Sequence, residues 1–379
     1  MKTIGWWEER GGARCVAYRG PLKGSDLRLH YGFDGWGEPI RNTRLESIGP
    51  NLAVARVPEI DTHLALDCAV TDGVRWDNNL GTDYRLWVGF DALDGHMHLS
   101  GGGRGALGLA TLVTAMASAG MVCGVSSWID NRALDRVDWA AISIFPLVWV
   151  RSGNTQLDEV RARLGTGAVG LKLHPTVDGY PAHDHALDPY LALAAENGCP
   201  VACHSAPGGA DPDHIRRLAE RFPSVPLILY HTYLGPPDGR RRAAAHVREQ
   251  PNLYLETSWC GSDVVAWLVG QVGANRVLFG SDASIDGPAH YRRRPPNVEG
   301  RETYNDGLIA LVRTLGPDAA HLVMGDNARR LFRLNSNSHG YDGGQAGTKR
   351  ATGSEVSGPV PRAKQDSNAR PPSFRHARR

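Results

Sequence analysis

The sequence has little of several features that would mark a membrane or nucleic-acid-binding protein. No apolar run in its 379 residues approaches the roughly 20 residues that a membrane-spanning helix needs. The opening stretch, MKTIGWWEERGG, lacks the apolar segment of a secretory signal. The formal net charge is only +2, so no basic excess indicates binding to nucleic acid or to a membrane surface. We therefore expect a cytoplasmic protein with neither of these partners.

Cysteine motifs and lysine are also scarce. The six cysteines form no CxxC motif, and we interpret them as reduced thiols, with a Cys15–Cys68 disulfide as the alternative. Only five lysines occur, so arginine carries most of the positive charge. Lys172 is the sole lysine between residues 24 and 348, and it lies inside an apolar run. Its placement makes it a candidate functional residue.

Three parts of the chain differ in their residue pattern. Residues 1–90 contain short alternating runs such as LRLHYGF and THLALDCAV, with turns about every 8 to 12 residues, which predicts a small β-sandwich. Residues 91–334 instead alternate short apolar runs with amphipathic stretches. Residues 335–379 have few apolar side chains and much Ser, Gly, Pro and Arg, so we expect a disordered tail.

The middle part predicts an α/β fold. Its candidate strands are 92–97, 121–129, 141–147, 168–174, 199–204, 226–231, 252–256 and 276–281. Its candidate helices include 105–119, 156–164, 187–197, 212–222, 239–249 and 262–272. Eight βα-like units are typical of a (β/α)8 TIM barrel, which takes about 250 residues. A doubly wound sheet is the alternative, but it usually has fewer strands.

Residues of the metal-ligand type follow the ends of these candidate strands. His96 and His98 lie two positions apart, and side chains alternate along a strand, so both imidazoles point to one side. Further strand ends carry Lys172, His174, His204, His231 and Asp282. Barrel active sites form at these strand ends, and divalent transition metals prefer imidazole and carboxylate ligands. The alternative is a group of hydrogen-bonded histidines without metal. A second His-x-His, His183 and His185, is interpreted as a solvated loop pair.

Six motifs follow one another along the middle part: DGHMHL, GLKLHP, VACHS, YHTYLG, FGSD and GDNARRLFRL. As an ordered set they resemble the amidohydrolase superfamily, specifically its amidohydrolase-2 or aminocarboxymuconate-semialdehyde-decarboxylase-like branch. The resemblance covers roughly residues 91–334. It implies one divalent metal ion, with zinc expected, held by His96, His98, His204 and Asp282. It also implies that Asp282 takes the proton of a metal-bound water and that His231 polarises or protonates the substrate, roles that suit a carboxylate and an imidazole.

Lys172 leaves two interpretations open. In binuclear members of the superfamily, a lysine on the fourth strand is carboxylated and bridges two metals. Lys172, together with His174, is therefore a candidate ligand of a second ion. Alternatively, Lys172 is a cation that binds a substrate carboxylate or pairs with an acid. We favour one metal, because this branch of the superfamily usually has one.

Over about residues 12–90, LRLHYGFDGWGEP and VRWDNNLGTDYRLWVG resemble the starch-binding modules of family 25. Those modules bind α-glucan with a histidine and two tryptophans, and the matching positions here are His30, Trp36 and Trp76. An indole offers apolar surface to a sugar ring, while Asn78 and Asn79 offer polar partners to its hydroxyls. The alternatives are that both tryptophans belong to the sandwich core, or that the module has lost binding and serves as a structural or docking domain.

These features together indicate a metal-dependent hydrolase of a small-molecule substrate, with an N-terminal carbohydrate-binding-like module for an α-glucan-like ligand. The bond attacked is an amide, ester or lactone, and sugar-derived compounds are candidate substrates. Two alternatives stay open: a decarboxylase of the same branch, and a glycan-binding protein whose barrel is catalytically idle. The oligomeric state also stays open, with a homo-oligomer as one option.

Overall fold

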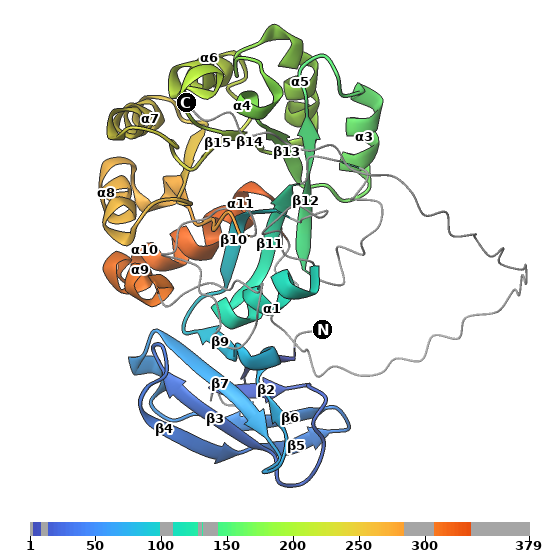
Figure 1. Cartoon of the computed structure of the whole chain (residues 1–379), viewed down its shortest axis with the longest axis vertical. Helices are drawn as coiled ribbons and strands as arrows, with labels where there is room; N and C mark the ends of the chain where they lie inside the picture. The colour runs from blue at the N-terminus through green and yellow to red at the C-terminus, as the bar shows by residue number, and fades with distance from the viewer. Residues whose placement is uncertain are drawn as a thin grey trace, which may run out of the picture. The chain divides into compact units, whose positions relative to one another are not determined.

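The computed structural model describes residues 3–8, 14–98, 109–127, 131, 143–283 and 307–334. Along these residues an antiparallel sandwich comes first and a parallel barrel second (Figure 1). The expected tail, residues 335–379, lies outside the described residues. None of the helices in the described ranges is long and apolar enough to cross a membrane.

The sandwich consists of two antiparallel sheets. The first has the order β1-β2-β6-β5 and contains β1 (Ile4–Glu8), β2 (Arg14–Tyr18), β5 (Glu46–Gly49) and β6 (Leu52–Arg56). The second has the order β4-β3-β7-β8, with β9 also paired to β7. It contains β3 (Arg28–Phe33), β4 (Gly37–Arg44), β7 (Ala65–Thr71), β8 (Trp76–Asp77) and β9 (Tyr84–Trp87). Single turns of 3₁₀ helix, η1 (Ile60–Thr62) and η2 (Asn79–Gly81), interrupt the strands.

The alternating pattern of β3 explains how the two sheets share a core. Leu29, Tyr31 and Phe33 are buried and belong to one apolar cluster with Tyr18 of the first sheet. His30 lies between them in sequence, so its side chain points to the outer face of the second sheet. The sandwich predicted for the first part of the chain is therefore confirmed.

The barrel is a single parallel sheet of eight strands in chain order. Its strands are β10 (Ala92–His98), β11 (Met121–Ser127), β12 (Ile144–Val150), β13 (Gly170–Leu173), β14 (Val201–His204), β15 (Leu227–Tyr230), β16 (Leu253–Glu256) and β17 (Val277–Leu278). Backbone hydrogen bonds close the sheet: the N–H of Gly95 donates to Phe279 O at 2.9 Å and the N–H of Asp282 to His96 O at 2.8 Å. The TIM barrel predicted from the strand pattern is confirmed.

Helices cover the outside of this sheet, as Figure 1 shows for α5 to α8. The helices are α1 (Leu109–Ala119), α3 (Leu157–Gly165), α4 (Pro175–Asp178), α5 (Asp188–Asn197), α6 (Pro212–Arg221), α7 (Pro237–Glu249), α8 (Ser262–Val272), α9 (Gly307–Leu315), α10 (Pro317–His321) and α11 (Asn327–Leu331). A π-helical turn, η7 (Leu322–Asp326), joins α10 to α11, and short 3₁₀ turns are η4 (His185–Leu187), η5 (Gly208–Ala210) and η6 (Ala274–Arg276). In α6, Asp211 caps the N-terminus and Pro212 occupies the first turn, which starts the helix.

Two layers of apolar side chains hold the barrel together. Outward-facing strand residues such as Leu171 and Leu173 pack against the helices, where Ile215 and Leu218 of α6 are buried. Inward-facing residues fill the interior together with α11 and the residues after it, in a cluster that includes Leu93, Leu147, Ile228, Leu278, Leu331 and Phe332. All six cysteines are buried with reduced thiols, as the cysteine pattern predicts.

Candidate metal centre

The His-x-His pair of β10 meets the aspartate that follows β17. His96 and His98 are both buried, and their Nε2 atoms lie 3.0 Å apart. Asp282 Oδ1 lies 3.4 Å from the Nε2 of His96 and 3.1 Å from that of His98. Three ligand atoms thus surround one point, as a divalent cation requires. The donor set is two imidazoles and a carboxylate, which fits such an ion.

The backbone at this end of the barrel is strained in several places. His231, Trp259 and Asp282 all have positive φ, at 67°, 64° and 54°. Non-glycine residues adopt this region at an energetic cost, and such residues cluster at functional sites. All three follow the ends of neighbouring barrel strands, β15, β16 and β17. Because the backbone at these residues departs from strand geometry, strand alternation does not determine where their side chains point.

Asp282 is fixed through both of its oxygens. Its Oδ2 accepts a hydrogen bond from Trp259 Nε1 at 2.8 Å, while its Oδ1 faces the two imidazoles. Burial raises the pKa of this carboxyl, but hydrogen bonding and charge from His98, with the indole hydrogen bond, outweigh burial and hold the pKa below its usual range. Asp282 therefore stays ionised, the state in which it accepts protons and binds cations.

Glu256 is a part of the site that the sequence analysis missed. It ends β16, is fully buried, and its Oε2 lies 2.9 Å from His96 Nδ1. Burial raises the pKa of Glu256 to about 8. The candidate strand 252–256 ends on this acidic residue, so the same rule that selected the other strand ends could have selected it. A carboxylate on the outer nitrogen of a ligand histidine orients the ring toward the metal.

The other predicted histidines line the same end of the barrel. His204 is buried, and its Nδ1 has no hydrogen-bond partner in the described part of the chain. Its ring stacks on His174, with centroids 4.0 Å apart, and lies 4.9 Å from that of His231. Burial lowers the pKa of His174 to about 2 and that of His231 to about 3. These neutral rings are candidate ligands and proton acceptors, although His204 does not join the three-atom cluster.

Lys172 and His174 differ in how the structure places them. The Nζ of Lys172 is inside the barrel, 3.9 Å from the ring centroid of Tyr230, and burial lowers its pKa to about 8. Within the described residues, no carboxylate is in ion-pair contact with this ammonium group. β13 ends at Leu173, and His174 instead caps α4 by accepting the N–H of Val177 at its Nδ1, 3.2 Å away. Strand alternation therefore does not extend to His174.

The second His-x-His pair lies apart from these groups. His183 is half-buried and stacks on His214 with centroids 4.5 Å apart. His185 is exposed, and its Nδ1 is 2.9 Å from Asp188 Oδ2. Neither histidine belongs to a potential metal-binding group among the described residues.

In the sandwich, three of the predicted sugar-binding residues come together. His30 on β3 lies 5.5 Å from Trp36 and 5.4 Å from Trp76, measured between ring centroids. Trp36 is half-buried in the turn after β3, where Asp67 Oδ2 accepts its N–H, whereas Trp76 is 53% exposed. The three rings form an aromatic patch on the outer face of the second sheet, which we call the His30 patch.

Asn78 and Asn79 have local partners instead. Asn78 Oδ1 accepts the N–H of Gly81, and Asn79 Nδ2 donates to Thr82 Oγ1 at 2.9 Å and to Asp83 O at 2.8 Å. Both side chains are half-buried and stabilise the η2 turn next to Trp76. Their role in the turn accounts for these hydrogen bonds without a ligand.

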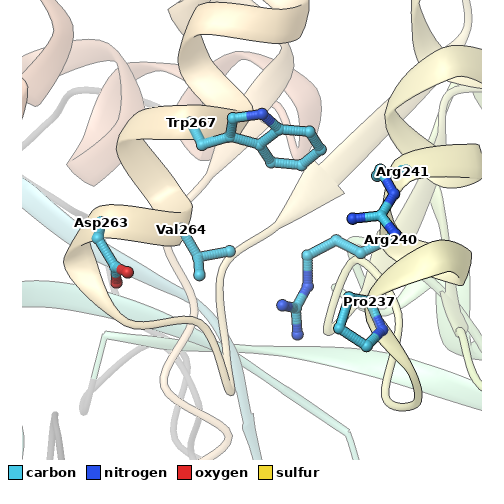
Figure 2. Close-up of a pocket in the computed structure, with 6 residues that line it drawn as sticks. All are labelled: Pro237, Arg240, Arg241, Asp263, Val264 and Trp267. Carbon is cyan, nitrogen blue, oxygen red and sulfur yellow. The ribbon is translucent and has the colours of Figure 1, made fainter.

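A separate hollow of about 260 Å³ lies between α7 and α8. Figure 2 shows Val264 and Trp267 of α8 facing Arg240 and Pro237 of α7 across it. None of the predicted site residues lines this hollow. It is therefore a surface feature of the helical layer, distinct from the strand ends that carry the candidate metal ligands.

Comparison with known proteins gives one family and several structural neighbours. Residues 106–334 match the amidohydrolase family model. No curated protein matches the chain in sequence.

Several solved structures are similar to the chain at low sequence identity. One is a probable 2-pyrone-4,6-dicarboxylic acid hydrolase from Acinetobacter baumannii, with 13% identity, a TM-score of 0.50, and coverage of 65% of this chain and 100% of that one. Another is an amidohydrolase 2 from Bifidobacterium longum subsp. infantis, with 19% identity, a TM-score of 0.48 and coverage of 65% and 100%. A third is a 5-carboxyvanillate decarboxylase from Novosphingobium aromaticivorans, complexed with manganese, with 12% identity, a TM-score of 0.45 and coverage of 65% and 97%.

Proposed function

The chain belongs to the amidohydrolase family, and we propose that it is a metal-dependent hydrolase of an amide, ester or lactone bond in a small substrate. The cluster of buried donor atoms from His96, His98 and Asp282 carries this proposal. Imidazole and carboxylate ligands together favour a first-row divalent ion, and we propose zinc. A bound ion supplies Lewis acidity toward a water molecule and a substrate oxygen.

His204 is the proposed fourth ligand. Its buried Nδ1 has no partner within the described ranges, and burial holds its pKa below the usual value, so the ring is a neutral donor. His204 would then hold the ion together with His96, His98 and Asp282. His98 is kept in the correct orientation by the contact of its Nδ1 with Ser127 O at 3.2 Å.

The chain's own residues can divide the proton transfers between them. Asp282 is ionised and lies at the cluster, so it is the proposed base for the attacking water. His231 is neutral and is the proposed second group that exchanges a proton with the substrate. Lys172 is the proposed cationic contact, because no carboxylate among the described residues forms an ion pair with its buried ammonium group.

A decarboxylase is the second candidate function. The same ammonium group of Lys172 favours it, since a decarboxylase must bind a substrate carboxylate inside the barrel. A carboxylated Lys172 that bridges two ions would remove this cation and its affinity for a carboxylate. Mass spectrometry of the intact protein distinguishes the two states, because carboxylation adds the mass of CO2.

A substrate screen with product analysis tests the proposal. Purified protein loaded with zinc is incubated with esters, lactones, amides and carboxylates, including sugar-derived ones. Hydrolysis adds water to the products, whereas decarboxylation releases CO2. Release of CO2 without hydrolysis would favour the second candidate. A protein that binds no metal and turns over none of these compounds would instead be a glycan-binding protein with an idle barrel.

For the sandwich we propose binding of an α-glucan-like ligand at the His30 patch. The supporting observation is that His30, Trp36 and Trp76 lie together, with one indole half exposed. An exposed indole offers a flat apolar surface to the C–H face of a sugar ring. The sugar-derived substrates in the screen follow from this proposal.

Replacing Trp76 with alanine is expected to weaken binding of a maltooligosaccharide about tenfold. This corresponds to about 1.4 kcal/mol, within the range for loss of one aromatic contact. Because Trp76 is 53% exposed, the melting temperature should stay unchanged. Calorimetry with maltoheptaose measures the affinity. Trp267→Ala on α8, which is 38% exposed, is the matched control and should bind normally. Equal affinity in the Trp76 variant and the unmodified protein would contradict the proposed patch.

A further inference from the structure

A hydrogen-bonded group of buried residues lies behind the candidate metal ligands. Its centre is Glu256, whose Oε2 accepts the backbone N–H of His231 at 2.9 Å and the hydroxyl of Ser258 at 2.7 Å. The same oxygen is 2.9 Å from His96 Nδ1. The other oxygen, Oε1, accepts the backbone N–H of Ser258. One buried carboxylate thus contacts residues from three different strand ends.

The hydroxyl of Ser258 settles which atom of His231 carries the proton. A serine hydroxyl has a single proton, and because an ionised carboxylate only accepts hydrogen bonds, the proton of Ser258 goes to Glu256 when Glu256 is ionised. Ser258 Oγ is also 2.8 Å from His231 Nδ1, so in this second contact the ring nitrogen must be the donor. A neutral His231 with its proton on Nδ1 has a lone pair on Nε2.

The same reasoning applies to His96. An ionised carboxylate only accepts hydrogen bonds, so the contact of Glu256 with His96 Nδ1 requires a proton on that nitrogen. The Nε2 of His96 then carries the lone pair, and this atom is the one that faces His98 and Asp282. With the opposite tautomer, an N–H group would point at the place of the cation.

The absence of a side chain at Gly280 leaves space for the carboxylate of Glu256. A Cβ atom added at Gly280 would overlap Glu256 Oε1 and the Cβ of His96. Gly280 has no positive φ, so close approach, and not backbone conformation, is what glycine provides here. The glycine of the FGSD motif therefore makes room for the contact between Glu256 and His96.

We propose that Glu256 and Ser258 are positioning residues that place the proton on Nδ1 of both His96 and His231, so that both Nε2 lone pairs face the site. Glu256 then orients the proposed metal ligand His96 directly. It orients the proton-exchanging residue His231 through the hydroxyl of Ser258. His231 accordingly starts the reaction as a proton acceptor and donates only after it has been protonated. The effect on turnover rests on the proposed function, whereas the tautomers do not.

The tautomers are measured directly by long-range ¹H–¹⁵N NMR on the full chain labelled with ¹⁵N-histidine. The metal-free protein is examined at pH 9, where the imidazoles are neutral and Glu256 is ionised. The signals of His96 and His231 are assigned by their loss in His96→Asn and His231→Asn. Both rings are expected as the Nδ1–H tautomer.

Two variants separate the two contacts. In Ser258→Ala the signal of His231 should shift toward the Nε2–H tautomer while that of His96 stays unchanged. In Glu256→Gln both signals should change, and the affinity for Co²⁺ should fall about 10- to 100-fold. Ser126→Ala is the control, since this buried hydroxyl has no hydrogen-bond partner among the described residues, and it should change neither tautomer. Should Glu256→Gln fail to fold, Ser258→Ala is a smaller substitution and still tests the tautomer of His231.

An Nε2–H tautomer of His231 in the unmodified protein would overturn the proposal, as would a Ser258→Ala variant with an unchanged His231 signal. Failure of the unmodified protein to bind Co²⁺ would contradict the proposed function and would leave the tautomer result intact. The two inferences are therefore tested separately.

Discussion

Turnover is expected to fall at least a hundredfold when Asp282 is replaced with asparagine, while the fold stays intact. The substitution keeps the volume of the side chain but removes the group that accepts a proton. Loss of a general base alone lowers rates by about 10²- to 10⁴-fold. The fold should survive because the residue lies on the functional face of the barrel and outside its packed layers. Circular dichroism and turnover of the substrate found in the screen measure the two effects.

The hydrogen bond from Trp259 makes this prediction more specific. The indole N–H needs an acceptor, so the amide oxygen of the asparagine should take the place of Asp282 Oδ2. The amide NH2 would then face the Nε2 atoms of His96 and His98, where the ion is proposed to bind. We therefore expect weaker metal binding that persists in part through His96, His98 and His204. Adding Trp259→Phe frees the amide to rotate and should recover some of the affinity.

A surface aspartate provides the control for this variant. Asp263→Asn changes an exposed residue in the first turn of α8 and should leave both turnover and metal affinity unchanged. Near-normal turnover of Asp282→Asn with metal bound would show that Asp282 is not the base. His231, or Lys172 in its carboxylated form, would then be the next candidate.

Metal content should fall from close to one ion per chain to none when His96 and His98 are both replaced with alanine. The two imidazoles supply two of the three atoms in the cluster, and Asp282 with the proposed ligand His204 would not hold a transition metal tightly. Two buried side chains are also lost, so a lower melting temperature is expected at the same time. Atomic emission spectroscopy of purified, dialysed protein measures the metal.

The second His-x-His of the chain is a matched control. His183→Ala with His185→Ala changes the same residue types at the same spacing, but neither residue belongs to a potential metal-binding group within the described ranges. This variant should keep its full metal content. Unchanged metal content in the His96 and His98 variant would rule out the proposed site.

The sequence by itself determined the parts of this protein that depend on local periodicity. Alternation along a strand places His96 and His98 on one side and His30 opposite Leu29 and Tyr31, because successive residues of a strand face opposite ways. The order of eight βα units was likewise sufficient for the barrel, since a parallel strand needs a crossover helix. The family followed from an ordered set of motifs and is confirmed for residues 106–334.

Only the tertiary structure decided which side chains meet. His96 and Glu256 are 160 residues apart, and their contact exists because barrel closure brings the ends of β10 and β16 to the same place. Trp259 donates a hydrogen bond to Asp282, and His174 caps α4 instead of extending its strand. Both arrangements depend on the conformations of residues after the strand ends, which strand periodicity does not specify. The orientation of a catalytic group is set by such long-range hydrogen bonds and positive-φ residues, and neither has a signature in the local sequence pattern.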